Sequence, residues 1–62
     1  MKFYDIITKV DDATIIRARV DMFGMKFSTE HYGRYFIDND ELMEKQVTDI
    51  RVVDGVLEVI LA

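Results

Sequence analysis

The chain has 62 residues, of which half are hydrophobic and about a third are charged, and it contains neither proline nor cysteine. This composition is typical of a single globular domain and excludes collagenous, low-complexity and disordered chains. The absence of cysteine excludes disulfides, zinc ribbons, thiol nucleophiles and iron–sulfur sites.

The net charge of −4 arises entirely from Tyr32 onward, where three basic residues stand against seven acidic ones. This balance gives no general affinity for phosphate backbones, so we expect no nucleic-acid partner. No uncharged stretch approaches the roughly 20 residues that span a bilayer, and the first residues lack the apolar core of a signal peptide. We therefore expect a soluble cytoplasmic protein that does not bind membranes.

Residues 3–10 predict a short helix, because their apolar members recur at i, i+3, i+4 and i+7. These members are Phe3, Ile6, Ile7 and Val10. A first strand is the alternative, since the same residue types also favour sheets.

Residues 13–20 and 26–31 alternate between apolar and polar types and predict a hairpin connected around the Phe23-Gly24 dipeptide. Opposed residues of a hairpin point to the same face, so Val20 should lie opposite Phe27. The same register forms two complementary charge pairs, Arg17–Glu30 and Asp21–Lys26.

Asp38 predicts the start of a second helix, which should end near Gln46. Asp38 and Glu41 have the spacing of a capping box, and Ile37 and Leu42 are placed for a hydrophobic staple. Acidic residues in the first turn also suit the positive end of the helix dipole.

Residues 47–53 and 56–61 predict a second hairpin, because Asp54-Gly55 between them is the preferred chemistry of a type I′ turn. A turn centred there opposes Arg51 to Glu58. The predicted buried face of this hairpin consists of Ile50, Val52, Leu57, Val59 and Leu61.

The order helix, hairpin, helix, hairpin predicts an α+β domain over residues 1–62, with both short helices on one face of a four-stranded, mainly antiparallel sheet. A small all-β barrel with one short helix is the alternative. The other sheet face should carry mixed charges and three apolar residues, Ile15, Val56 and Ile60. A domain of this size buries only about 60% of its unfolded surface. We therefore expect a homodimer that covers these three residues.

The candidates for catalysis and metal binding are few. Ser28 and His31 are the only serine and histidine, and three residues apart in a strand they point to opposite faces. A cluster of carboxylates lacks the glycine and the alternating ligands of a calcium loop, so helix capping explains it better. The cluster consists of Asp38, Asp40, Glu41 and Glu44. We expect neither an enzyme, nor a metal site, nor a cofactor.

Residues 31–36 are the one segment with binding character, because aromatic side chains with an arginine are typical of interface hot spots. The candidate binding residues are Tyr32, Arg34, Tyr35 and Phe36, although some of these aromatics could instead close the core. Arg17 and Arg19, together with Arg34, are the candidate contacts for a small anionic ligand.

The chain has a familiar layout, which opens with Phe3-Tyr4-Asp5-Ile6-Ile7, Asp11-Asp12 and Thr14-Ile15-Ile16-Arg17. It closes with Glu41-Leu42-Met43, Val47-Thr48-Asp49-Ile50 and Asp54-Gly55-Val56-Leu57-Glu58-Val59-Ile60. In this layout the whole chain resembles small accessory proteins encoded by bacterial phages and prophages. The resemblance implies a non-catalytic interaction module in the host cytoplasm that binds and inhibits a host protein, including proteins of defence systems. The alternatives are a protein that sequesters a small ligand or nucleotide at an oligomer interface, and a structural homo-oligomer.

Overall fold

The computed structural model describes residues 1–22 and 25–62, and the predicted connection at Phe23 and Gly24 lies outside the described residues. Its elements are α1 (Phe3–Ile7), β1 (Ile15–Met22), β2 (Met25–Tyr32), the 3-10 helix η1 (Gly33–Phe36), α2 (Asp40–Met43), β3 (Val47–Val53) and β4 (Val56–Leu61). This order confirms the predicted α+β class. It also shows that the first segment is a helix and not a strand.

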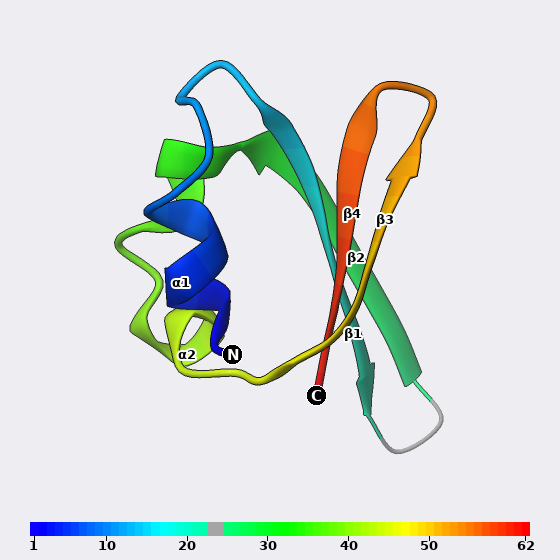
Figure 1. Cartoon of the computed structure of the whole chain (residues 1–62). Helices are drawn as coiled ribbons and strands as arrows, with labels where there is room; N and C mark the ends of the chain where they lie inside the picture. Colours follow the sequence, from blue (N-terminus) through cyan, green and yellow to red (C-terminus); the bar gives the residue numbers. More distant parts are fainter. Residues whose placement is uncertain (23–24) are drawn as a thin grey trace.

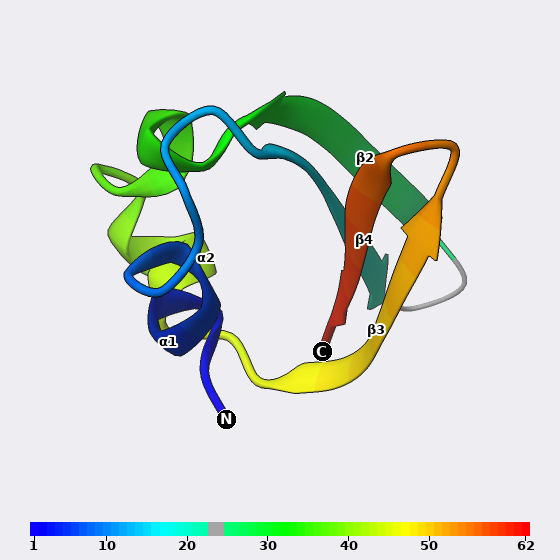
Figure 2. The same cartoon turned by 45° about the horizontal axis from the view of Figure 1, so that its top comes forward.

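The four strands form one sheet in the order β2-β1-β4-β3. The hairpin pairs β1–β2 and β3–β4 are antiparallel, whereas the central pair β1–β4 is parallel. Figures 1 and 2 show α1 and α2 side by side against one face of this twisted sheet. The sheet stays open, so the alternative of an all-β barrel is wrong.

Both predicted hairpin registers are confirmed. In the first hairpin Val20 lies opposite Phe27 and Arg17 opposite Glu30. In the second hairpin Arg51 lies opposite Glu58, as the complementary charges indicated. Asp54 and Gly55 have φ angles of 52° and 78°, and two positive φ angles in succession are the signature of a type I′ turn.

Replacement of Gly55 with valine should lower the free energy of unfolding by about 1 kcal/mol or more, because a β-branched residue is strained at positive φ. An added Cβ would meet no atom within 4 Å, so the loss is expected from the backbone conformation and not from a clash at Cβ. Urea titration measures the effect, with Asp54→Asn as the control, since asparagine tolerates this conformation. A Gly55→Val protein as stable as the parent would contradict the type I′ turn.

The core lies between the helices and the central strands β1 and β4. Its buried side chains are Phe3, Ile7, Ile16, Ala18, Val20, Phe36, Leu42, Met43, Val59 and Leu61. The apolar stripe of the first segment is used as predicted, because Ile6 and Val10 also pack against this cluster. The helix itself ends at Ile7, so the predicted range of 3–10 was too long.

The start and end of α2 differ from the prediction. The N-cap is Asn39, whose Oδ1 accepts a hydrogen bond from the Leu42 N–H at 3.1 Å, and not Asp38. Because Asp38 precedes the cap, the predicted capping box with Glu41 and its staple are wrong. The helix ends at Met43, well before Gln46, because the following residues pair with the N-terminus. Their backbone hydrogen bonds are Phe3 N to Lys45 O and Val47 N to Met1 O.

The cap assignment gives a paired test. Asn39→Ala should lower the free energy of unfolding by about 0.5–2 kcal/mol, because the Leu42 N–H loses its acceptor. Asp38→Ala, which removes an exposed side chain next to the cap, should change it by less than about 0.5 kcal/mol. Urea titration of both variants distinguishes the two positions. A larger loss for Asp38→Ala than for Asn39→Ala would contradict the Asn39 cap and support the capping box predicted from the sequence.

The burial of β3 is also corrected. Ile50 and Val52 were expected in the core, but they are 39% and 75% exposed. The helices are too short to cover them, since the five residues of α1 span about 7 Å and the seven residues of β3 about 23 Å. Moreover α1 packs against α2 and η1. The N-terminus meets β3 at the first residue of the strand, Val47, whose N–H donates to the Met1 carbonyl. The helix-side face of the sheet is therefore only partly covered.

Candidate functional site

A groove of about 350 Å³ opens on the helix side of the sheet, between the β1–β2 hairpin and the η1–α2 segment. Its apolar lining consists of Val20, Phe27, Tyr35, Phe36 and Leu42, and its polar lining of Thr29, Asn39, Glu41 and Lys45. The volume lies at the lower end of the range for small-ligand pockets. We name this feature the β2 groove.

The floor of the β2 groove is part of the hydrophobic core. Val20, Phe36 and Leu42 are buried, and Phe36 is held by an edge-to-face contact with Phe3 at a ring separation of 5.4 Å. The walls are exposed aromatic rings: Phe27 is 59% exposed and Tyr35 63%. Phe27 points to the helix side because it lies opposite Val20, but the short helices do not reach far enough along β2 to cover it.

The wall at Tyr35 is ordered by its neighbours. The His31 ring stacks on Tyr35 at 3.7 Å, and Tyr35 meets Phe36 edge-on at 5.6 Å. Such aromatic pairs stabilise by about 0.5–1.5 kcal/mol beyond the area they bury. Tyr35 is therefore presented to solvent in a fixed orientation, which lowers the entropy cost of binding a partner.

The predicted binding segment divides between two places. Tyr35 and Phe36 line the β2 groove, with Phe36 as a core residue. Tyr32 and Arg34 instead line a more open hollow of about 390 Å³ with Asp12 and Ala13. The division occurs at Gly33, which is buried so closely that an added Cβ would lie 3.3 Å from Cγ2 of Val10.

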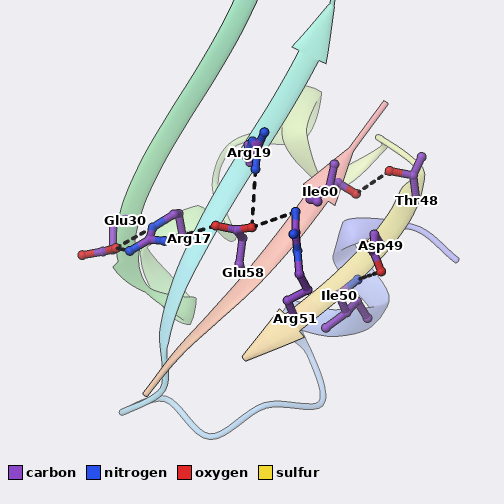
Figure 3. A network of polar contacts seen from close by, with 9 residues as sticks. All are labelled: Arg17, Arg19, Glu30, Thr48, Asp49, Ile50, Arg51, Glu58 and Ile60. Carbon is purple, nitrogen blue, oxygen red and sulfur yellow. Dashed lines mark hydrogen bonds and ion pairs between the residues drawn. The ribbon is translucent and has the colours of Figure 1, made fainter. Parts of the chain in front are cut away.

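The opposite face of the sheet carries an ion-pair network around Glu58 (Figure 3), which is only 7% exposed. Three arginines point at its carboxylate: Arg17 at 3.1 Å, Arg51 at 3.3 Å and Arg19 at 3.6 Å. Arg17 also binds Glu30 at 2.8 Å. These hydrogen bonds, to Glu30 first and then to Glu58, raise the pKa of the Arg17 guanidinium above its ordinary value.

Arg17 and Arg19, which were predicted to contact a small anion, both belong to this network. The register aligns Glu30, Arg17, Glu58 and Arg51 in one row across all four strands, so opposite charges alternate. An incoming anion at Arg17 or Arg19 has to compete with carboxylates already in place. Of the predicted anion contacts, Arg34 lies away from this row, beside the second hollow.

The predicted interface residues lie on this same face. Ile15 is exposed, and Val56 and Ile60 are half-buried. The charged row runs between Ile60 on one side and Ile15 with Val56 on the other. The three side chains therefore do not form one continuous apolar surface.

The structure agrees with the expected separation of the two catalytic candidates. His31 pairs with Ile16 of the core face, whereas Ser28 pairs with Arg19 of the opposite face. Among residues 1–22 and 25–62, no group of three or more histidine or carboxylate side chains is arranged to hold a metal ion. Nor does that part of the chain contain a helix long and apolar enough to cross a membrane.

Comparisons with protein-family models, curated proteins and solved structures found no match to this chain. The choice of the β2 groove as the candidate site therefore depends only on the residues that line it. Sequence reasoning found two of its lining residues, Tyr35 and Phe36, but assigned Phe27 and Leu42 only to folding. The signal that could have found Phe27 was the shortness of the predicted helices relative to the strand that carries it.

Proposed function

We propose that this protein is a non-catalytic protein-interaction module that receives an apolar side chain of its partner in the β2 groove. The observation that carries the proposal is the pair of exposed aromatic walls, Phe27 and Tyr35, over a floor of buried core residues. Exposed aromatics around a pre-formed pocket are typical of interface hot spots. Folding leaves these rings exposed, and their burial against a partner removes apolar surface from water, which favours binding.

The rim of the groove supports a protein partner. Glu41 is exposed on α2 and Asn39 at the N-cap of that helix, and Lys45 follows beyond its end. An apolar centre with polar groups around it is the usual anatomy of a protein–protein interface. The resemblance to phage-encoded accessory proteins supports the narrower proposal that the partner is a host protein, including a defence protein, which this chain inhibits by occupying its surface.

Site-specific photo-cross-linking tests this function. A benzophenone amino acid replaces Phe27 or Tyr35 in the full chain, and Tyr4 in the control, because Tyr4 is exposed on α1 and does not line the groove. In bacterial lysate we expect the two groove positions to capture the same protein, and unlabelled chain to compete for it. The captured protein, once purified, should lose its activity when the parent chain is added.

Two outcomes contradict the proposal. One is the absence of any saturable cross-link from either groove position. The other is capture of the same protein with equal yield from Tyr4, which would show a contact unrelated to the groove.

Capture of a small anionic ligand is a second candidate function, and the hollow at Tyr32 and Arg34 favours it. A guanidinium beside an aromatic ring suits a phosphate attached to a base. A nucleotide present at a hundred times its dissociation constant should stabilise the fold by about 2.7 kcal/mol, which a thermal-shift assay detects as several degrees. Arg34→Gln should abolish that shift. An unchanged melting temperature across a panel of nucleotides would remove this candidate.

A further inference from the structure

β3 is an edge strand, and its outer edge lies at the opposite side of the sheet from the β2 groove. All five residues between Val47 and Val53 are exposed. They include Ile50 and Val52, whose side chains lie on the partly covered helix-side face. In the part of the chain that the structure describes, β4 is the only strand that pairs with β3 along its length. Edge strands of this kind offer a ready template for another strand.

The hairpin geometry shows which backbone groups point outward from β3. Val53 and Val56 flank a two-residue turn, so they form the hydrogen-bonded pair next to it. The alternation then directs the N–H and C=O groups of Val52 and Ile50 away from β4. The Asp49 side chain agrees with this, because its Oδ1 accepts the Ile50 N–H at 2.9 Å (Figure 3).

We propose that two copies of this chain associate through β3, antiparallel, with Ile50 of one copy opposite Ile50 of the other. A two-fold axis perpendicular to the sheet requires that residues opposite each other share a face. The axis must therefore pass through a pair in which a residue lies opposite its own symmetry mate. This register sets Asp49 opposite Arg51 of the second copy and, by symmetry, Arg51 opposite Asp49 of the second copy.

The neighbouring registers lose this complementarity. A register centred on Arg51 opposes two arginines, and one centred on Asp49 opposes two aspartates. Like charges directly opposite each other are destabilising, whereas opposite charges stabilise a strand pair. The charge pattern of β3 therefore selects the pairing centred on Ile50.

The pairing gains contacts on both faces of the sheet. On the helix side, Ile50, 39% exposed in the single chain, meets its own symmetry mate. The register of β3 shifts between Val47 and Asp49, so the regular pairing is centred on Asp49, Ile50 and Arg51. On the opposite face, Asp49 releases the Ile50 N–H, which is then taken by the Ile50 carbonyl of the second copy. Arg51 is half exposed beside Glu58 and can reach the incoming carboxylate without leaving the network. Four strands thereby become one sheet of eight.

Light scattering on a dilution series of the full chain tests the proposal. The mass should approach twice 7.3 kDa at high concentration and fall to 7.3 kDa on dilution. Asp49→Lys sets lysine opposite arginine twice and should raise the dissociation constant of the dimer by about tenfold or more. Ile15→Lys adds the same charge type to an exposed site away from β3 and should leave the dimer unchanged. Circular dichroism of each variant verifies that it is folded.

A second variant removes the backbone contact and leaves the charges in place. Ile50→Pro deletes an N–H that points away from β4, and proline is tolerated on an outward-facing edge position. It should give a folded monomer. A parent chain of 7.3 kDa at every concentration would overturn the proposal, as would a dimer that survives both β3 substitutions. Loss of the dimer in Ile15→Lys alone would overturn it in favour of pairing through the charged face.

Discussion

Replacement of Phe36 with alanine should lower the free energy of unfolding by about 3–5 kcal/mol, the range typical of a fully buried phenylalanine. Phe36 is 1% exposed and forms the floor of the β2 groove. It contacts Phe3 of α1 and Tyr35 at ring separations of 5.4 and 5.6 Å. Its removal leaves a cavity where η1, α1 and the sheet meet.

The expected loss is comparable to the whole stability of a small domain, which is about 0.05–0.15 kcal/mol per residue. Phe36→Leu is therefore the second variant, since leucine keeps an apolar side chain and should cost about 1–2 kcal/mol, so the chain stays folded. Tyr35→Ala is the matched control: the adjacent ring is exposed, so its removal leaves no cavity, and loss of its contacts with His31 and Phe36 should cost about 1–2 kcal/mol. Urea titrations followed by circular dichroism measure all three. Equal losses at the two positions would contradict the assignment of Phe36 to the core.

Tyr35→Ala also separates stability from binding. The variant keeps the floor of the β2 groove and loses one wall. It should therefore fold like the parent and still fail to bind the partner captured by photo-cross-linking. Partner binding at parental strength by a folded Tyr35→Ala protein would place the interface elsewhere on the molecule.

The hairpins could be predicted from the sequence because local rules determine them. Asp54-Gly55 requires the positive φ angles that both residues adopt, and this fixes the pairing of Val53 with Val56. In the first hairpin, the demand that Val20 and Phe27 share a face leaves one register with complementary charges. Turn chemistry and cross-strand pairing act over a few residues, so a short stretch of sequence contains the information.

The helix boundaries were harder because neighbouring residues compete for the same role. Asp38 and Asn39 are both good capping residues, and the sequence favoured Asp38 through its spacing to Glu41. In the structure the N-cap is Asn39. η1 continues to Phe36, and the turn that follows it extends to Asn39, whose N–H donates to the Phe36 carbonyl at 2.9 Å. The 3-10 helix has too few residues to leave a periodic pattern, and its position decides which aromatics line the β2 groove.

Neither the parallel pairing of β1 with β4 nor the environment of Glu58 could be predicted, because the strand order is a property of the whole chain. Each hairpin contributes one charge pair to the charged row, Arg17–Glu30 from the first and Arg51–Glu58 from the second. The parallel contact brings the two pairs into one network and adds Arg19 at 3.6 Å. A glutamate expected on a mixed-charge surface is thereby buried among three arginines.

Glu58→Gln should lower the free energy of unfolding by about 1–3 kcal/mol, the value typical of hydrogen bonds to charged groups. Glutamine preserves the shape of the side chain, so packing against β1 and β3 remains. It removes the negative charge that Arg17, Arg19 and Arg51 share, and the three guanidinium groups then face one another around a neutral amide. Removal of a buried carboxylate is costly because the guanidinium groups lose the charge that it supplied, although Arg17 keeps its ion pair with Glu30. Urea titration at low ionic strength measures the loss.

The control is Glu44→Gln, which also removes a close ion pair, to Lys2 at 2.6 Å, but an exposed one. Exposed pairs contribute about 0–1 kcal/mol, so this variant should stay close to the parent. Salt separates charge repulsion from lost packing. If repulsion among the arginines destabilises Glu58→Gln, then raising the salt concentration from about 0.01 to 1 M, which shortens the screening length roughly tenfold, should restore part of its stability relative to the parent. The loss of stability in Glu58→Gln could instead be the same at both salt concentrations. Glu58 would then stabilise the sheet through hydrogen-bond geometry and packing, and solvent would already screen the positive charges of the three arginines.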